Sequence, residues 1–219
     1  MIEYMSLVLI SFLSYILGSI PFSYLVARAY GQNLYQIGSK NIGTANVYRA
    51  TGNFLPTLLA LVGDVGKGTF AIYLAQKLGF LGYNLFQAQA LAAFFVVAGH
   101  NWPIFLKFKG GRGLASLIGV LLALKWQAII LAIVVTVVVI ILVEFSTKKG
   151  IKLEGRFKEK FKALVTVIIS QILGRVLGIL ASAVLIYIYY PQVFKITLAA
   201  AILSGIKHVK RTKDFLEKK

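Results

Sequence analysis

The stretch LASLIGVLLALKWQAIILAIVVTVVVIILVEF, residues 114–145, decides what kind of fold this sequence can adopt. Its only charged residues are Lys125 and Glu144. About 20 consecutive apolar residues are enough for a helix to cross a bilayer. Because hydrocarbon offers the backbone no hydrogen-bond partners, an apolar segment crosses it as an α-helix, whose backbone bonds are internal. We therefore predict an all-α integral membrane protein.

The composition of the whole chain supports this class. Of its 219 residues, 58% are hydrophobic and 14% are charged, against about 25% charged residues in a soluble domain. There is no cysteine, which excludes disulfides, a thiol nucleophile and cysteine metal sites. The net charge of +17 would also suit a nucleic-acid-binding protein. Basic cytoplasmic loops of a membrane protein explain it better, so we expect no nucleic-acid partner.

The apolar segments predict seven spans, at about residues 4–27, 53–77, 84–105, 114–124, 126–145, 162–187 and 190–206. The first lacks a basic n-region and is long enough to span, so we interpret it as a helix and not as a cleaved signal. Only Lys125 separates the fourth span from the fifth, and one broken helix is the alternative there. Residues 1–206 are predicted to form one polytopic membrane domain, and residues 207–219 a basic cytoplasmic tail.

The distribution of Lys and Arg predicts the topology. With seven spans and the N-terminus outside, nineteen Lys and Arg residues lie in cytoplasmic segments and three lie outside. This bias obeys the positive-inside rule. Merging the fourth and fifth spans would invert the later loops and remove most of the bias. We therefore predict seven spans with the C-terminus in the cytoplasm.

Three polar segments on the predicted cytoplasmic side combine glycine with a cation. The first, IGSKNIGTANVYRATG at 37–52, contains Lys40 and Arg49. Its glycines let backbone N–H groups turn toward an anion. An ordinary turn-rich loop between spans is the plainer interpretation.

The second segment, GDVGKG at 63–68, lies within an apolar span. Asp64 and Lys67 are three residues apart and share a helix face. Ionisable groups inside a span usually face a polar interior, and a purely structural ion pair is the alternative. The glycine spacing is not that of a Walker loop.

The third segment, GHNWPIFLKFKGGRGLAS at 99–116, has three glycines around Arg112 just before a predicted helix. A glycine-rich turn that leads into a helix N-terminus suits phosphate, and Arg adds a planar bidentate donor. We expect Gly111 to adopt a positive φ. His100 alone would more often be structural than catalytic, and His208, the other histidine, could be a solvated residue of the tail.

These segments together favour phosphate-bearing substrates. Two histidines and few acids do not make a convincing metal site, and no nucleophile elbow is present. The pattern therefore favours a reaction managed by anion binding, with no metal and no cofactor.

The three segments, in this order, resemble the signature motifs of the PlsY family, the acyl-phosphate glycerol-3-phosphate acyltransferases. The resemblance implies seven helices in the bacterial cytoplasmic (inner) membrane, with a cytoplasmic active site. It implies transfer of a fatty acyl group from acyl phosphate to the 1-hydroxyl of glycerol 3-phosphate, which gives lysophosphatidic acid and phosphate in the first step of phospholipid synthesis. The binding partners would be these two substrates and membrane lipid. The resemblance is compatible with a monomer.

The resemblance also implies roles by matching positions. Four residues would be catalytic: Ser39, Arg49, Arg112 and His208. Seven would bind substrate: Gly38, Asn41, Lys67, His100, Asn101, Gly110 and Gly111. Asp64 and Gly43 would give structural support.

Several positions depart from the family pattern: Asn33, Tyr35, Lys40, Ala45, Arg112 and Arg211. The alternatives are therefore a divergent paralogue with another acceptor or without activity, and a membrane transporter or lipid-phosphate-binding protein. A transporter site would be expected near the midplane, often with repeat symmetry, whereas these motifs gather at one predicted face.

Overall fold

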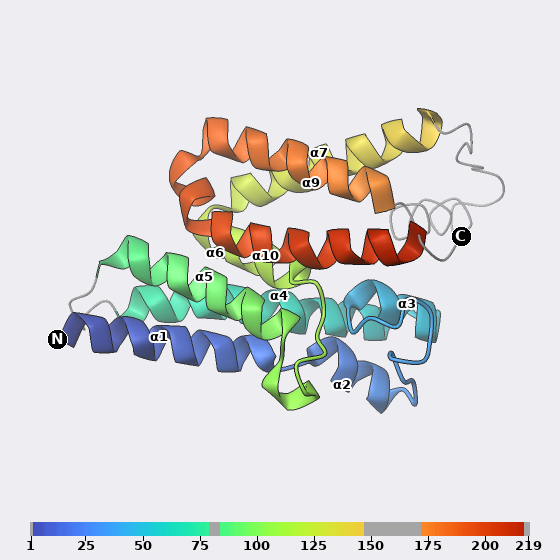
Figure 1. Cartoon of the computed structure of the whole chain (residues 1–219), viewed down its shortest axis with the longest axis horizontal. Coiled ribbons are helices and arrows are strands. Elements are labelled where there is room, and N and C mark those ends of the chain that lie inside the picture. Colours follow the sequence, from blue (N-terminus) through green and yellow to red (C-terminus); the bar gives the residue numbers. More distant parts are fainter. Residues whose placement is uncertain (1, 79–83, 147–171, 217–219) are drawn as a thin grey trace. The chain divides into compact units, whose positions relative to one another are not determined.

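The computed structural model describes residues 2–78, 84–146 and 172–216, and each regular element in these ranges is a helix (Figure 1). In chain order they are α1 (Ile2–Ser19), α2 (Phe22–Ala29), α3 (Thr44–Thr51), α4 (Phe54–Lys77), α5 (Leu85–Asn101), the 3₁₀ turn η2 (Ile104–Leu106), α6 (Leu114–Leu124), α7 (Trp126–Ser146), α9 (Ile172–Tyr189) and α10 (Pro191–Leu216). The prediction of an all-α chain is confirmed for these residues.

Four segments of the described chain are long and apolar enough to cross a membrane: Glu3–Ala29, Phe54–Lys77, Leu85–Leu106 and Trp126–Ser146. Lys125 has an extended backbone, with φ −162° and ψ 100°, and it separates α6 from α7. Two helices, α6 and α7, therefore follow one another with the single residue Lys125 between them. That they are two separate spans and not one broken span stays a prediction. The total of seven spans and their orientation stay predictions.

Two predicted boundaries are wrong. The first segment is not one continuous helix, because α1 ends at Ser19 and α2 begins only at Phe22. Pro21 in this gap has no N–H to donate and its ring would clash within a helix. The last helix does not end at residue 206 but continues to Leu216. Of the predicted span 162–187, residues 162–171 lie outside the described residues.

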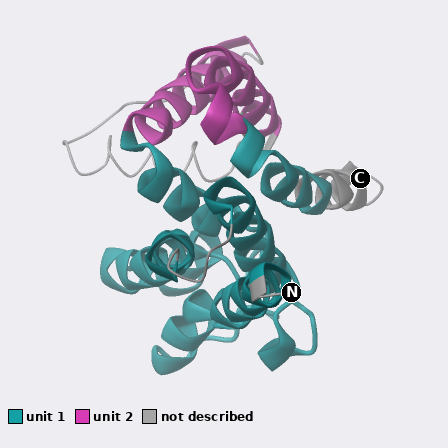
Figure 2. Cartoon of the chain, turned by 90° about the vertical axis from the view of Figure 1, so that its left-hand side faces the viewer, with its two compact units in different colours: residues 1–126, 195–219 teal, residues 127–194 magenta. Residues whose placement is uncertain are grey.

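The chain divides into two compact units (Figure 2). Unit 1 contains residues 1–126 and 195–219, and unit 2 contains residues 127–194. In unit 2, α7 and α9 approach closely at Gly178, where a Cβ would lie 2.7 Å from the Cα of Thr136. All the predicted site residues belong to unit 1. The division of residues 1–206 from a separate tail stays a prediction.

Glycines set the closest helix contacts of unit 1. α1 packs on α5, and α4 packs on α6. A Cβ at Gly18 would collide with the Val96 carbonyl, and one at Gly99 with the Tyr15 carbonyl. Gly68 and Gly119 bring α4 and α6 together in the same way. Because lipid gives helices little hydrophobic reason to associate, such close backbone contact is how membrane helices gain packing energy.

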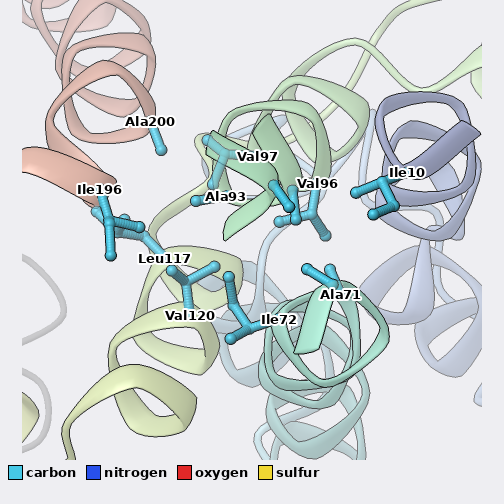
Figure 3. Close-up of a cluster of buried hydrophobic side chains, with 13 residues drawn as sticks. Ile10, Ala71, Ile72, Ala93, Val96, Val97, Leu117, Val120, Ile196 and Ala200 are labelled. Atoms are coloured by element: carbon cyan, nitrogen blue, oxygen red, sulfur yellow. The ribbon is translucent and has the colours of Figure 1, made fainter. Parts of the chain in front are cut away.

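Buried aliphatic side chains fill the space between these helices. They come from α1, α4, α5, α6 and α10, and Figure 3 shows them meeting in one cluster. The cluster includes Ile10, Ala71, Ile72, Ala93, Val96, Val97, Leu117, Val120, Ile196 and Ala200. This cluster holds together α4, α5 and α10, the helices that carry Lys67, His100 and His208.

Gly66 and Gly68 provide a matched test of this packing. A Cβ at Gly68 would collide with the Ser116 carbonyl, whereas nothing lies within 4 Å of a Cβ at Gly66. We expect Gly68→Ala to lower the free energy of unfolding by about 1–3 kcal/mol. Gly66→Ala should be neutral or stabilising by up to about 1 kcal/mol. Thermal unfolding of both variants in detergent micelles measures this, and equal effects would contradict the packing argument.

Candidate active site

A buried ion pair lies beside the break between α1 and α2. On α4, Lys67 Nζ is 2.9 Å from Asp64 Oδ1, and both side chains are almost fully buried. Lys67 Nζ also donates to the carbonyls of Gly18 and Ile20, each at 2.9 Å. An ammonium group has three protons, and three acceptors surround this one. Lys67 is therefore well satisfied within the protein.

The break in the first segment explains why Lys67 finds these acceptors. In a continuous helix the Gly18 carbonyl would accept from the N–H of Phe22. Here the Phe22 N–H bonds to Ile20 O instead, at 3.2 Å. The Gly18 carbonyl is left for the Lys67 ammonium.

Asp64 connects the ion pair to two further helices. Its Oδ2 accepts a hydrogen bond from Ser23 Oγ of α2, at 2.5 Å. Its Oδ1 lies 3.5 Å from His100 Nδ1 at the end of α5. The Ser23 hydroxyl is also 3.4 Å from Thr44 Oγ1, at the start of α3. The Asp64 carboxylate therefore contacts Ser23, which lies near the first motif, and His100, which belongs to the third.

Asn46 organises the first loop, and the sequence analysis missed it. From α3 its Nδ2 donates to the carbonyls of Leu34 and Ile37, at 3.1 and 3.0 Å. Its Oδ1 accepts from the backbone N–H of Ser39 at 2.9 Å. This side chain is 1% exposed. A buried asparagine with both ends of its amide bonded fixes a loop conformation.

The predicted residues of the first motif lie around this loop. Gly38 has a φ of +55°, and a Cβ there would be 2.5 Å from Asn46 Oδ1 and 3.4 Å from the Arg49 side chain. Gly43 is the N-cap of α3 and bonds to the Asn41 carbonyl at 3.0 Å. Ser39 Oγ is buried and has no hydrogen-bond partner among the described residues.

The third motif packs its glycines on His100. The Gly111 N–H donates to the His100 carbonyl at 3.0 Å. A Cβ at Gly110 would collide with the same carbonyl, and one at Gly111 with His100 Nε2. Only Gly113 of the three glycines has a positive φ, +77°. The expectation of a positive φ at Gly111 is wrong, because close approach to the imidazole is what requires glycine there.

Arg112 precedes a helix N-terminus that no side chain of the described residues caps. Gly113 is the N-cap of α6, so the first N–H groups of α6 point toward the loop end that carries Arg112. Such N–H groups and an adjacent cation suit an anion. Asn101, fully buried, donates from Nδ2 to the Leu203 carbonyl of α10 at 3.3 Å.

The C-terminal helix contacts this loop at two more points. Ser204 Oγ donates to the Arg112 carbonyl at 2.7 Å. Lys207 Nζ lies 4.7 Å from the centre of the Trp102 ring, a cation–π contact. His208 is the next residue of α10, and its side chain lies outside the described part of the structure.

Tyr35 joins the first loop to the third. Its hydroxyl donates to the Lys109 carbonyl at 2.7 Å. Burial raises the pKa of Tyr35, and the neighbouring Tyr24 raises it further. This hydrogen bond therefore joins the loop that contains Ser39 to the loop that contains Arg112. The hydrogen-bond partners of Ser23, Tyr35 and Ser204 could not be predicted, because no sequence motif marks these residues.

Within the described ranges, no group of three His, Asp or Glu side chains gathers as a metal site would require. That the reaction needs no metal stays a prediction.

The helical fold and this site define a membrane protein in which two glycine- and cation-rich loops lie beside the buried Asp64–Lys67 ion pair. The family model for glycerol-3-phosphate acyltransferase matches residues 8–218, and the chain belongs to this family. The predicted resemblance is therefore confirmed.

Curated relatives agree with this assignment. A glycerol-3-phosphate acyltransferase of Jannaschia sp. is 49% identical over 119 residues, which cover 54% of this chain and 56% of the relative. One from Rubrobacter xylanophilus is 48% identical over 117 residues, covering 53% and 56%. The chain thus spans a little over half the length of the curated relatives it matches.

The fold resembles that of PlsY, an integral membrane glycerol 3-phosphate acyltransferase. Its glycerol 3-phosphate form matches with a TM-score of 0.70 at 23% identity, covering 97% of this chain and 93% of that one. Its lysophosphatidic acid form matches with a TM-score of 0.71 at 21% identity and the same coverage. At this identity the likeness concerns the fold.

The Asp64–Lys67 pair can be tested by removing its members in turn. Asp64→Ala leaves a buried cation without its carboxylate, and we expect it to lower the free energy of unfolding by about 3–5 kcal/mol. Adding Lys67→Met should recover part of this loss, because no buried charge remains. Thermal unfolding of the single and double variants measures the difference, with Lys77→Met, at the exposed end of α4, as the control. Additive losses would contradict pairing.

Proposed function

We propose that this chain transfers a fatty acyl group from acyl phosphate to the 1-hydroxyl of glycerol 3-phosphate. The observation that carries the proposal is the Tyr35–Lys109 hydrogen bond, which joins the two glycine- and cation-rich loops. Two phosphate-bearing substrates need two such loops at one site. Membership of the glycerol-3-phosphate acyltransferase family supports the same reaction.

The chemistry requires little of the protein beyond positioning. The 1-hydroxyl oxygen attacks the acyl carbonyl carbon, the bond from that carbon to the phosphate oxygen breaks, and the hydroxyl proton passes to the leaving phosphate. The products are lysophosphatidic acid and inorganic phosphate. Alignment of two bound reactants can supply several kcal/mol of the barrier, of order 7–11 at best. Fixed cations and N–H groups stabilise the charge that develops on the carbonyl and phosphate oxygens.

The loops divide the work between the two substrates. Ser39 and Arg49, with Gly38 and Asn41, would hold one phosphate. The unpartnered Ser39 hydroxyl supports this role.

The second cradle would consist of Gly110, Gly111 and Arg112 with the N-terminus of α6. His100 and Asn101 would order it from below through their contacts with Gly111 and Leu203. His208 would act near the acceptor.

Lys67 is better suited to bracing than to binding substrate. Its ammonium already faces Asp64 and two carbonyls. We therefore propose that Asp64 and Lys67 together hold the break between α1 and α2, with Gly43 starting α3 nearby.

One assay tests the function. Purified full-length chain is mixed with long-chain acyl phosphate and glycerol 3-phosphate, and released phosphate and lysophosphatidic acid are measured. Stoichiometric formation of both supports the proposal. Binding of the substrates without turnover would instead indicate a divergent lipid-phosphate-binding paralogue, and acyl-CoA replacing acyl phosphate would refute the donor.

Variants of the third motif test its role in catalysis. Arg112→Ala should lower kcat/KM by at least about tenfold, on the order of 1.4 kcal/mol, and Arg112→Lys should recover much of this. Gly111→Val should be as harmful, because its side chain would collide with the His100 imidazole. Steady-state kinetics measures both. A lipid-facing basic loop without a catalytic role would instead tolerate Arg112→Ala.

The orientation is proposed from the charge distribution: seven spans in the bacterial cytoplasmic membrane, with the N-terminus outside. The chain has no cysteine, so Lys40→Cys, Lys107→Cys, Lys77→Cys and Lys125→Cys each introduce one exposed thiol. We expect a membrane-impermeant maleimide applied to intact cells to label positions 77 and 125 and to spare positions 40 and 107. The reverse pattern, or external labelling at both 40 and 107, would refute the topology.

A further inference from the structure

The two glycines before Arg112 are bracketed by hydroxyl groups from distant parts of the chain. Tyr35 donates to the Lys109 carbonyl, directly before Gly110, and Ser204 donates to the Arg112 carbonyl, directly after Gly111. Both hydrogen bonds are 2.7 Å long. A Gly-Gly pair has unusual backbone freedom, so anchors on both sides restrict where the following arginine can lie.

The Tyr35 anchor is itself held in place. Its backbone N–H bonds to Asn33 Oδ1 at 3.2 Å, and its ring lies 5.7 Å from that of Tyr24 on α2. Tyr35 thus connects a fixed part of the first loop to the start of the Gly-Gly segment.

The Ser204 hydroxyl reaches a carbonyl outside its own helix. Serines in helices often donate to the carbonyl four residues earlier, as Ser11 does to Leu7 in α1 at 2.8 Å. Ser204 is 5% exposed and donates to Arg112 of another segment. The adjacent Leu203 carbonyl accepts from Asn101. This turn of α10 therefore contacts the start and the end of the third loop.

We propose that Tyr35 and Ser204 are positioning residues that hold the Gly110–Gly111 segment from both sides and so orient Arg112 toward the leaving phosphate. The claim about orientation rests on the proposed function. The bracket itself is a claim about structure and can be tested without substrate.

Amide hydrogen exchange of the full chain in detergent tests the bracket. Tyr35→Phe and Ser204→Ala each remove one hydroxyl, and exchange at the amides of residues 109–113 should accelerate about five- to tenfold. Ser204→Thr, which keeps a hydroxyl, should restore slow exchange. The controls are Tyr30→Phe, at an exposed tyrosine, and Ser11→Ala, whose hydroxyl bonds within its own helix. Unchanged exchange in both Tyr35→Phe and Ser204→Ala would overturn the proposal.

A double-mutant cycle tests action through Arg112. Tyr35→Phe and Ser204→Ala should each lower kcat/KM for acyl phosphate about five- to twentyfold in the unaltered chain. In an Arg112→Ala background they should change it less than about twofold, because coupled residues are not additive. The same loss in both backgrounds would show general damage to the fold and would overturn the positioning role.

The two experiments separate the two claims. A chain that transfers no acyl group refutes the proposed function, and hydrogen exchange still decides whether the bracket exists. A chain that transfers acyl groups but shows no coupling refutes the positioning role and leaves the proposed function standing. If Ser204→Ala does not fold, two other variants still test the proposal. Tyr35→Phe removes the hydroxyl on the other side of the Gly-Gly segment, and Ser204→Thr keeps a hydroxyl at position 204.

Discussion

The ammonium of Lys67 and the broken helix beside it depend on each other. A buried cation is costly unless charge and hydrogen bonds surround it. Asp64 supplies the charge, and the carbonyls of Gly18 and Ile20 supply the remaining acceptors. Those carbonyls face Lys67 because the helix breaks at Pro21. The break lets α2 pack on α4 and deliver the Ser23 hydroxyl to the same carboxylate.

From this centre the two candidate binding loops take their positions. On one side, Asp64 reaches Ser23, which lies near Thr44 at the start of the helix that carries Asn46 and Arg49. On the other, it faces His100, whose ring packs on Gly111. A single carboxylate therefore contacts Ser23, which lies near the first motif, and His100 of the third motif. Preorganised donors and cations of this kind stabilise developing charge without rearranging during the reaction.

Glycine serves different purposes along this chain. At Gly38 and Gly113 it permits a positive φ. At Gly18, Gly68 and Gly119 it admits a neighbouring backbone, and at Gly111 it admits an imidazole. Motif glycines that look alike in sequence thus act through conformation in some places and through packing in others. Alanine should be tolerated only at a glycine without a positive φ whose Cβ would meet no neighbour, as at Gly66.

Composition and spacing by themselves determined the all-α class and placed Asp64 and Lys67 on one helix face, because these depend on local hydrophobicity and helical period. The motif residues were also visible, since glycine and cation cluster locally. Only the tertiary structure decided the partners of Asn46, Tyr35 and Ser204 and brought Lys67 to the carbonyls at the Pro21 break. Tyr35 and Lys109 are 74 residues apart, and Ser204 and Arg112 are 92 apart. A lone hydroxyl or amide carries no local signal of so distant a carbonyl, because its partner is chosen by how the helices pack.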